Sequence, residues 1–167
     1  MIIECDNRKI KLSNQILKII FQYIQSEAYD TEAGGIIVGR ENLGNNNLIL
    51  EYITEPLNGD VRTRKRFLRK DPGHLSYYAQ LYNENDGIYA YFGEWHTHPE
   101  DVPRYSIIDL INWKRISKED PKKFQFHIIA GRKKITFWEM RREYLKPKLL
   151  YEEKWDEVII WKNKGEY

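Results

Sequence analysis

Two histidines separated by a single residue carry the clearest chemistry in this 167-residue chain. His96 and His98 lie in a run that reads Gly-Glu-Trp-His-Thr-His-Pro from residue 93. On an extended strand, side chains two residues apart point to the same face, with their Cα atoms about 7 Å apart. Both rings can then lean onto one ion at Zn–N distances of about 2.0–2.1 Å. The spacing is therefore consistent with a metal site, although most such pairs in strands are ordinary half-exposed histidines.

A serine and an aspartate follow the histidines at the start of a predicted helix. Ser106 can cap this helix, and Asp109 then stands in its first turn, where the helix dipole favours a carboxylate. The same pair is also a plausible capping box, with Asp in place of the usual Glu or Gln. The two roles are compatible, because a capped helix start presents a ligand rigidly. Two imidazoles and one carboxylate leave a fourth position for water, which is typical of a catalytic zinc site.

A hydrolytic zinc site also needs a base that accepts the proton of its water. The sequence offers four carboxylates for this role: Glu32, Glu94, Glu100 and Asp101. Spacing alone does not choose among them. Glu32 is equally consistent with a solvated loop acid, and Glu94 with a cross-strand partner of a basic residue.

Hydrophobic periodicity predicts the elements that must position these residues. We expect helices over residues 13–27, 71–87 and 106–116, and strands over residues 35–39, 48–53, 88–95, 124–130 and 135–140. Residues 149–161 predict one or two further strands or a short helix. Turn residues join the strands at 35–53 and at 124–140 into two expected hairpins. Strands outnumber the interleaved helices, so we expect an α/β fold of the α+β-like kind, with a mixed sheet covered by a few helices.

Composition bounds the class of protein. The length predicts a single domain over residues 1–167, and 27 basic against 25 acidic residues exclude a globally basic nucleic-acid binder. Cys5 is the only cysteine, which excludes an intramolecular disulfide and a thiolate-rich metal site. Neither a signal peptide nor an apolar run of about 18 residues is evident, so we expect a cytoplasmic protein with no membrane partner.

One strong charge run stands out between Arg62 and Lys70, with six cations in nine residues around Phe67. Such a run is typical of a solvated loop or edge strand. Two functional alternatives remain: a contact for an acidic substrate or partner, and a nucleic-acid contact in which Phe67 stacks on a base. The remaining histidines, His74 and His127, have no ligand-like neighbours, and we interpret both as structural.

The whole pattern resembles the signature of the JAMM, or MPN-plus, zinc metalloprotease family. The positions that carry the resemblance are Glu32-x-Gly34-Gly35-x-x-x-Gly39, His96-x-His98, Ser106 and Asp109. The sequence around the two histidines is similar to that of the prokaryotic JAB branch. Within that branch it is most similar to the isopeptidases of bacterial antiphage operons of the CBASS type, which remove ubiquitin-like modifiers.

The resemblance implies the MPN/JAMM fold, with a cytidine-deaminase-like architecture, and one Zn²⁺ held by His96, His98 and Asp109. It further implies that Glu32 takes a proton from the water and hands it to the leaving amine, while Ser106 stabilises the oxyanion. The implied reaction cleaves the amide after the C-terminal residue of a ubiquitin-like protein. The implied substrate partner is such a protein or its conjugate, for example a conjugated nucleotidyltransferase.

Alternatives remain open at this point. One is a processing protease for a ubiquitin-like or sulfur-carrier precursor. Another is a nucleic-acid-associated JAMM-like protein that acts through Arg62–Lys70, although the small net charge makes nucleic acid the less expected partner. A third is a metal-binding scaffold without turnover, which the complete set of five motif residues disfavours.

Overall fold

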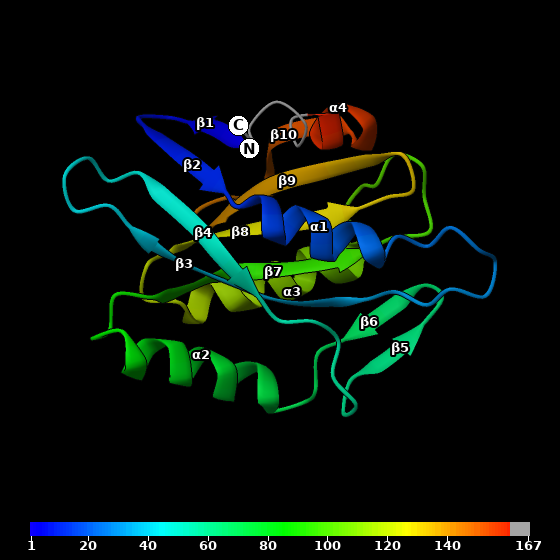
Figure 1. Cartoon of the computed structure of the whole chain (residues 1–167), viewed down its shortest axis with the longest axis horizontal. Helices are drawn as coiled ribbons and strands as arrows, with labels where there is room; N and C mark the ends of the chain where they lie inside the picture. Colours follow the sequence, from blue (N-terminus) through cyan, green and yellow to red (C-terminus); the bar gives the residue numbers. More distant parts are fainter. Residues whose placement is uncertain (161–167) are drawn as a thin grey trace.

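A mixed eight-stranded sheet with helices on both faces forms the protein, seen here in a computed structural model that describes residues 1–160 (Figure 1). The elements, in chain order, are β1 (Ile2–Cys5), β2 (Arg8–Leu12), α1 (Asn14–Gln22), β3 (Gly34–Glu41), β4 (Leu48–Ile53), β5 (Val61–Thr63), β6 (Arg66–Leu68), α2 (Gly73–Glu84), β7 (Ala90–Thr97), α3 (Ile107–Glu119), β8 (Phe124–Ala130), β9 (Lys134–Arg141), β10 (Lys148–Lys154) and α4 (Trp155–Ile160). The large sheet has the order β1-β2-β4-β3-β7-β8-β9-β10, and β5 pairs with β6 in a separate hairpin. Only β2–β4 and β7–β8 are parallel pairs within these residues. The predicted mixed sheet is confirmed.

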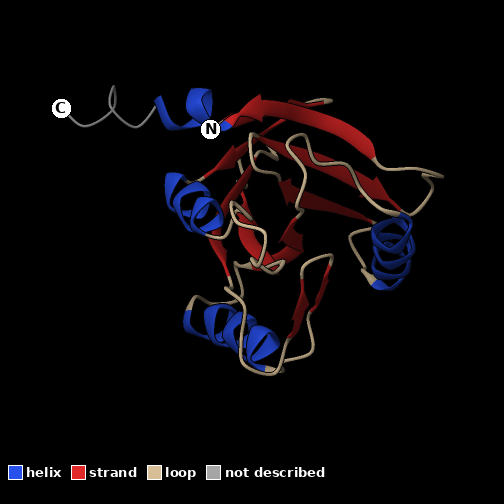
Figure 2. Cartoon of the chain, turned by 90° about the vertical axis from the view of Figure 1, so that its right-hand side faces the viewer, coloured by secondary structure: helices blue, strands red, loops and turns tan. Residues whose placement is uncertain are grey.

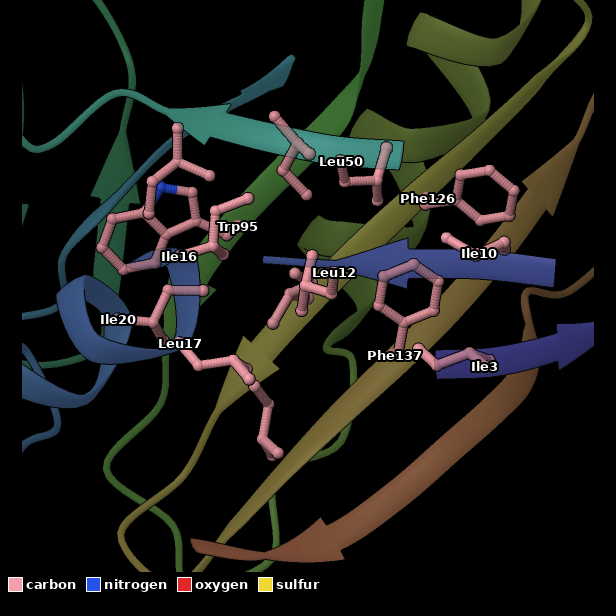
Figure 3. Close-up of a cluster of buried hydrophobic side chains, with 14 of the residues drawn as sticks. Ile3, Ile10, Leu12, Ile16, Leu17, Ile20, Leu50, Trp95, Phe126 and Phe137 are labelled. Carbon is pink, nitrogen blue, oxygen red and sulfur yellow. The ribbon is translucent and has the colours of Figure 1, made fainter. Parts of the chain in front are cut away.

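Helix α1 covers one face of the sheet because its apolar residues repeat at helical spacing. Ile16, Leu17 and Ile20 are buried and pack toward Trp95 and Leu12 (Figure 3). The Ser13 hydroxyl caps the helix by accepting the Ile16 N–H at 3.3 Å, as the sequence predicts.

Helices α2 and α3 lie on the opposite face, so the sheet is covered on both sides (Figure 2). Alternation along the strands produces the two layers. On β8, Ile128 packs with the α1 side, whereas its neighbour Ile129 packs under Trp113 of α3. On β3, Ile37 faces α1 and Ile36 faces α2. Both strands are therefore apolar on both faces, which explains their continuous hydrophobic runs.

Several predicted boundaries need correction. The first helix ends at Gln22 rather than near residue 27, because the Tyr23 N–H turns back to the carbonyls of Ile20 and Phe21. The strand expected at 88–95 begins only at Ala90, after the Asn85–Ile88 turn, and extends to Thr97. Helix α3 continues to Glu119, three residues beyond its predicted end.

Both predicted hairpins are confirmed, since β3–β4 and β8–β9 are antiparallel neighbours. The tail contains both alternatives, strand β10 and short helix α4, and the last predicted residue of this segment, Trp161, lies outside the described residues. The N-terminal hairpin β1–β2 was not predicted. No helix among residues 1–160 is long and apolar enough to span a membrane.

The centre of the sheet requires a glycine at position 93. Gly93 has a φ of +144°, beside an irregularity in the β3–β7 register, and a Cβ there would lie 1.8 Å from the carbonyl oxygen of Phe126. We expect Gly93→Ala to lower the free energy of unfolding by about 2–4 kcal/mol, measured by denaturant unfolding. In the control Gly44→Ala, the nearest atom lies 3.7 Å from the new Cβ, and we expect a change within about 0.5 kcal/mol. Equal stability of the two variants would contradict this account.

Candidate metal centre and active site

Three side chains converge at the carboxyl end of β7. The Nε2 atoms of His96 and His98 lie 3.0 Å apart. The Asp109 carboxylate from α3 faces both, with Oδ1 3.3 Å from His96 Nε2 and Oδ2 3.4 Å from His98 Nε2. All three donor atoms lie within 4.8 Å of one another. Two imidazole nitrogens and a carboxylate directed at one place form a donor set that suits a divalent metal such as zinc.

Main-chain hydrogen bonds fix the two histidines. His96 lies on β7 opposite Gly34 of β3 on one side and Ile129 of β8 on the other. The His98 N–H donates to the carbonyl of Ala130 at 3.0 Å, which continues the ladder beyond the end of β7. Burial disfavours a charged ring at His96, but the facing Asp109 carboxylate raises the pKa of this imidazole above its usual value.

The start of α3 fixes the carboxylate. Ser106 Oγ accepts the Asp109 N–H at 3.2 Å, and Asp109 Oδ2 accepts the Ser106 N–H at 2.6 Å, so the capping box that the sequence predicts is present. Burial alone would raise the pKa of Asp109, yet His96 and His98 hold it far below its ordinary value. The Asp109 carboxylate therefore caps the helix and faces both imidazoles at the same time.

Packing beneath α3 holds this helix in place. Trp113, one turn after Asp109, stacks on the buried His127 ring with centroids 4.2 Å apart and planes at 6°. Burial lowers the pKa of His127 to about 3, so this ring is neutral at physiological pH. His74 is also buried and bonds to Thr54 and Asp60. Both histidines therefore have the packing environments expected of structural residues.

Glu32 lines the same cleft as the converging residues. This cleft has a volume of about 510 Å³, and its walls include all five motif residues: Glu32, His96, His98, Ser106 and Asp109. Glu32 precedes β3, and the pairing of Gly34 with His96 brings it across from the histidines. Its side chain is only 4% exposed. Burial raises the pKa of Glu32 to about 7, while His96 opposes and Asp109 adds to this shift.

Two glycines allow the close approach of the segment that carries Glu32. A Cβ on Gly34 would lie 2.5 Å from the ring of Phe67, and a Cβ on Gly35 would lie 2.0 Å from the carbonyl oxygen of Thr54. Any larger residue at either position would displace the segment from the cleft.

The other three candidate bases have different surroundings. Arg69 Nε donates to Glu94 Oε1 at 2.8 Å, which makes Glu94 the partner of a basic residue. Glu100 is half exposed and 3.9 Å from His98 Nδ1. Asp101 pairs with Arg132 and Lys133. Of the four carboxylates, Glu32 combines burial with a pKa that is raised toward neutrality.

The sequence did not predict that the basic run would form a wall of this cleft. Hairpin β5–β6 and the residues beside it line the cleft opposite α3, through Lys65, Arg66, Phe67, Leu68 and Arg69. The isolated Phe67 was the one available signal, and its ring lies against Gly34.

Comparisons with known proteins indicate the family to which the chain belongs. A model of the family described as prokaryotic homologs of the JAB domain matches residues 16–141. Three relatives from Escherichia coli, Pseudomonas aeruginosa and Vibrio cholerae are all named CD-NTase/cGAS isopeptidase. They are 34%, 34% and 31% identical over 78%, 76% and 80% of this chain, and over 80%, 80% and 82% of their own lengths.

A solved structure supports the fold alone. The solution structure of a Desulfitobacterium hafniense protein superposes with a TM-score of 0.55 at 21% identity, over 83% of this chain and 89% of that one. The family model and the relatives each cover most of the chain, and the range that the family model matches includes every motif residue. The chain therefore belongs to the family of prokaryotic homologs of the JAB domain, has the JAB/MPN fold, and is a hydrolase of the isopeptidase class.

Proposed function

We propose that this protein is a zinc-dependent isopeptidase that hydrolyses the amide bond of a protein conjugate in a bacterial antiphage system. The observation that carries the proposal is the convergence of two imidazoles and a carboxylate in one cleft with the buried acid Glu32. His96, His98 and Asp109 would hold the ion, and they supply the nitrogen and oxygen donors that a catalytic zinc takes. When bound there, zinc would polarise the scissile carbonyl and lower the pKa of a water.

Glu32 is the proposed proton carrier. Its pKa of about 7 lets it exist in both protonation states near neutral pH, as a general base that later acts as an acid requires. In this role the Glu32 carboxylate takes the proton of the attacking water and then delivers it to the leaving lysine amine.

Ser106 is the proposed oxyanion donor. Its Oγ accepts the Asp109 N–H, so the hydroxyl hydrogen remains available for donation. The residue lines the cleft beside the converging side chains. A hydroxyl held by a helix cap is preorganised to stabilise the charge that develops on the carbonyl oxygen.

The substrate we propose is a conjugate of a CD-NTase-type nucleotidyltransferase, because the relatives from three bacteria are named for that activity. The proposed modifier on this enzyme is a ubiquitin-like protein, and the precursor of a ubiquitin-like or sulfur-carrier protein is the alternative substrate. An extended C-terminal tail suits the narrow cleft between hairpin β5–β6 and α3. Cleavage of a CD-NTase joined through an amide to a lysine, compared with cleavage of a ubiquitin-like precursor, separates the two by mass spectrometry.

The nucleic-acid alternative is disfavoured by the contacts of the basic run. Arg62 and Arg64 donate to main-chain carbonyls, and Arg69 is paired with Glu94. Three of the six cations therefore already have hydrogen-bond partners within the protein.

Zinc should bind to the metal-free protein with one ion per chain. At a free zinc concentration 100 times Kd, the gain in the free energy of unfolding is about 2.7 kcal/mol, seen as a rise in Tm. His96→Ala or His98→Ala should abolish this gain, measured by calorimetric titration and thermal unfolding. Asp6→Asn is the control, because Cys5, Asp6 and Glu139 also cluster, yet Arg141 already pairs with both carboxylates. If the parent protein bound a second zinc ion and Asp6→Asn lost it, the assignment of a single zinc site at His96, His98 and Asp109 would be contradicted.

Glu32→Gln should lower kcat by about 10²–10⁴-fold, because the amide cannot carry the proton. The zinc content of this variant should stay at one ion per chain. Glu94→Gln and Glu100→Gln test the other acids near the histidines and should remain within about tenfold of the parent activity. Full activity of Glu32→Gln would overturn the mechanism.

Two capping serines separate the stabilising role of Ser106 from its proposed catalytic role. Ser13 caps α1 and Ser106 caps α3, each by accepting a main-chain N–H. Ser13→Ala and Ser106→Ala should both lower the free energy of unfolding by about 1 kcal/mol. Only Ser106→Ala should also lower kcat, by about 10²–10³-fold. Similar kcat values for the two variants would assign capping as the whole role of Ser106.

A further inference from the structure

Hairpin β5–β6 forms hydrogen bonds with both main-chain polar groups of Glu32. The Glu32 N–H donates to the carbonyl of Thr63 at 2.8 Å. Arg62 Nε donates to the Glu32 carbonyl at 2.7 Å. The main-chain donor and the main-chain acceptor of one residue are therefore both satisfied by a hairpin that begins 29 positions later in the chain.

Glu32 needs such support because it stands outside regular secondary structure. Residues 23–33 contain neither helix nor strand. The next residue, Ala33, is tied to β7, since its N–H donates to Thr97 Oγ1 and its carbonyl accepts the Thr97 N–H, both at 2.9 Å. The peptide groups of Glu32 itself have hairpin partners instead. The position of this acid in the cleft thus depends on the hairpin.

Arg62 makes the one side-chain contact from the hairpin to the Glu32 main chain. Besides its bond to Glu32, its Nη2 lies 3.4 Å from the carbonyl oxygen of Thr31, and its guanidinium lies 5.9 Å from the centroid of the Tyr23 ring. The guanidinium therefore bridges two successive carbonyls with its fixed fork of donors, a geometry that lysine does not reproduce. Arg62 is absent from the lining of the cleft.

We propose that Arg62 is a positioning residue, which holds the Glu32 peptide in place so that the carboxylate meets the converging histidines and aspartate. The proposal rests on the proposed function, because it assigns Glu32 the role of proton carrier. Misplacement of a reacting group by about 1 Å can cost about 10²-fold in rate. Loss of one of the two hydrogen bonds that join Glu32 to the hairpin should cost less, about tenfold in kcat.

The hairpin has further anchors that do not involve Arg62. Arg64 Nη1 donates to the carbonyls of Glu27 and Ala28, and the buried Gln25 amide donates to the Arg64 carbonyl at 2.8 Å. The Phe67 ring packs on Gly34. Removal of the Arg62 side chain should therefore leave the hairpin docked and affect mainly residues 31 and 32.

The test compares Arg62→Ala with Lys70→Ala in the zinc-loaded full chain. Lys70 is also an exposed cation of the same run, with no side-chain ion pair among residues 1–160 and no place in the cleft lining. Arg62→Ala should lower kcat about tenfold with KM within about twofold and zinc content unchanged. Lys70→Ala should keep both constants within about twofold. Arg62→Lys keeps the positive charge but loses the planar set of guanidinium donors, so this variant should recover only part of the parent kcat. If Arg62→Ala fails to fold, Arg62→Lys becomes the test. A parent-like kcat in Arg62→Lys would then overturn the proposal.

A double-mutant cycle supplies the readout that a purely structural role would not move. If Arg62 acts through Glu32, Arg62→Ala should produce no further fall in kcat in a Glu32→Gln background. An additive tenfold fall would overturn the proposal, as would a raised KM with unchanged kcat, which would assign Arg62 to substrate binding. Parent-like activity of Glu32→Gln alone would instead refute the proposed function. An inactive Glu32→Gln with a fully active Arg62→Ala would refute only the role of Arg62.

Discussion

The antiparallel register of β3 and β7 is the constraint on which the candidate site depends. Gly34 pairs with His96, so a segment 62 residues away in sequence arrives beside the histidines through main-chain hydrogen bonds. This register persists only because positions 34 and 35 carry no Cβ, since the Phe67 ring and the Thr54 carbonyl occupy that space. The register of the sheet therefore brings the segment to the cleft, and the hydrogen bonds of hairpin β5–β6 then hold Glu32 itself.

The second constraint is the start of α3, where one carboxylate serves two purposes. Asp109 closes a capping box with Ser106 and at the same time faces both imidazoles. The capping bond restrains the carboxylate before any ion arrives, which lowers the entropy that a ligand loses on binding. Helix α3 is in turn held by the stack of Trp113 on His127. The contacts that stabilise the start of α3 therefore also orient Asp109 toward the histidines.

The sequence predicts those parts of this arrangement that are local. His96 and His98 share a face because they lie two apart at the end of a strand, and Ser106 and Asp109 form a cap because they lie three apart at a helix start. The choice of Glu32 among four acids was not local, since it depends on a strand pairing that spacing does not specify; only the family resemblance indicated it. Hairpin β1–β2 was missed because its strands of four and five residues are too short for a clear period.

The basic run forms the exposed hairpin that its charge predicts, but two of its arginines have a further structural role. Runs of cations are usually solvated. The sequence of this run does not indicate that Arg62 and Arg64 donate hydrogen bonds to main-chain carbonyls. The loop over residues 23–33 has no ladder partner, so its carbonyls need donors from elsewhere. Arg62 and Arg64 supply these donors to four carbonyls, those of Glu27, Ala28, Thr31 and Glu32. An irregular loop beside the candidate active-site cleft is therefore stabilised by Arg62 and Arg64 in place of a neighbouring strand.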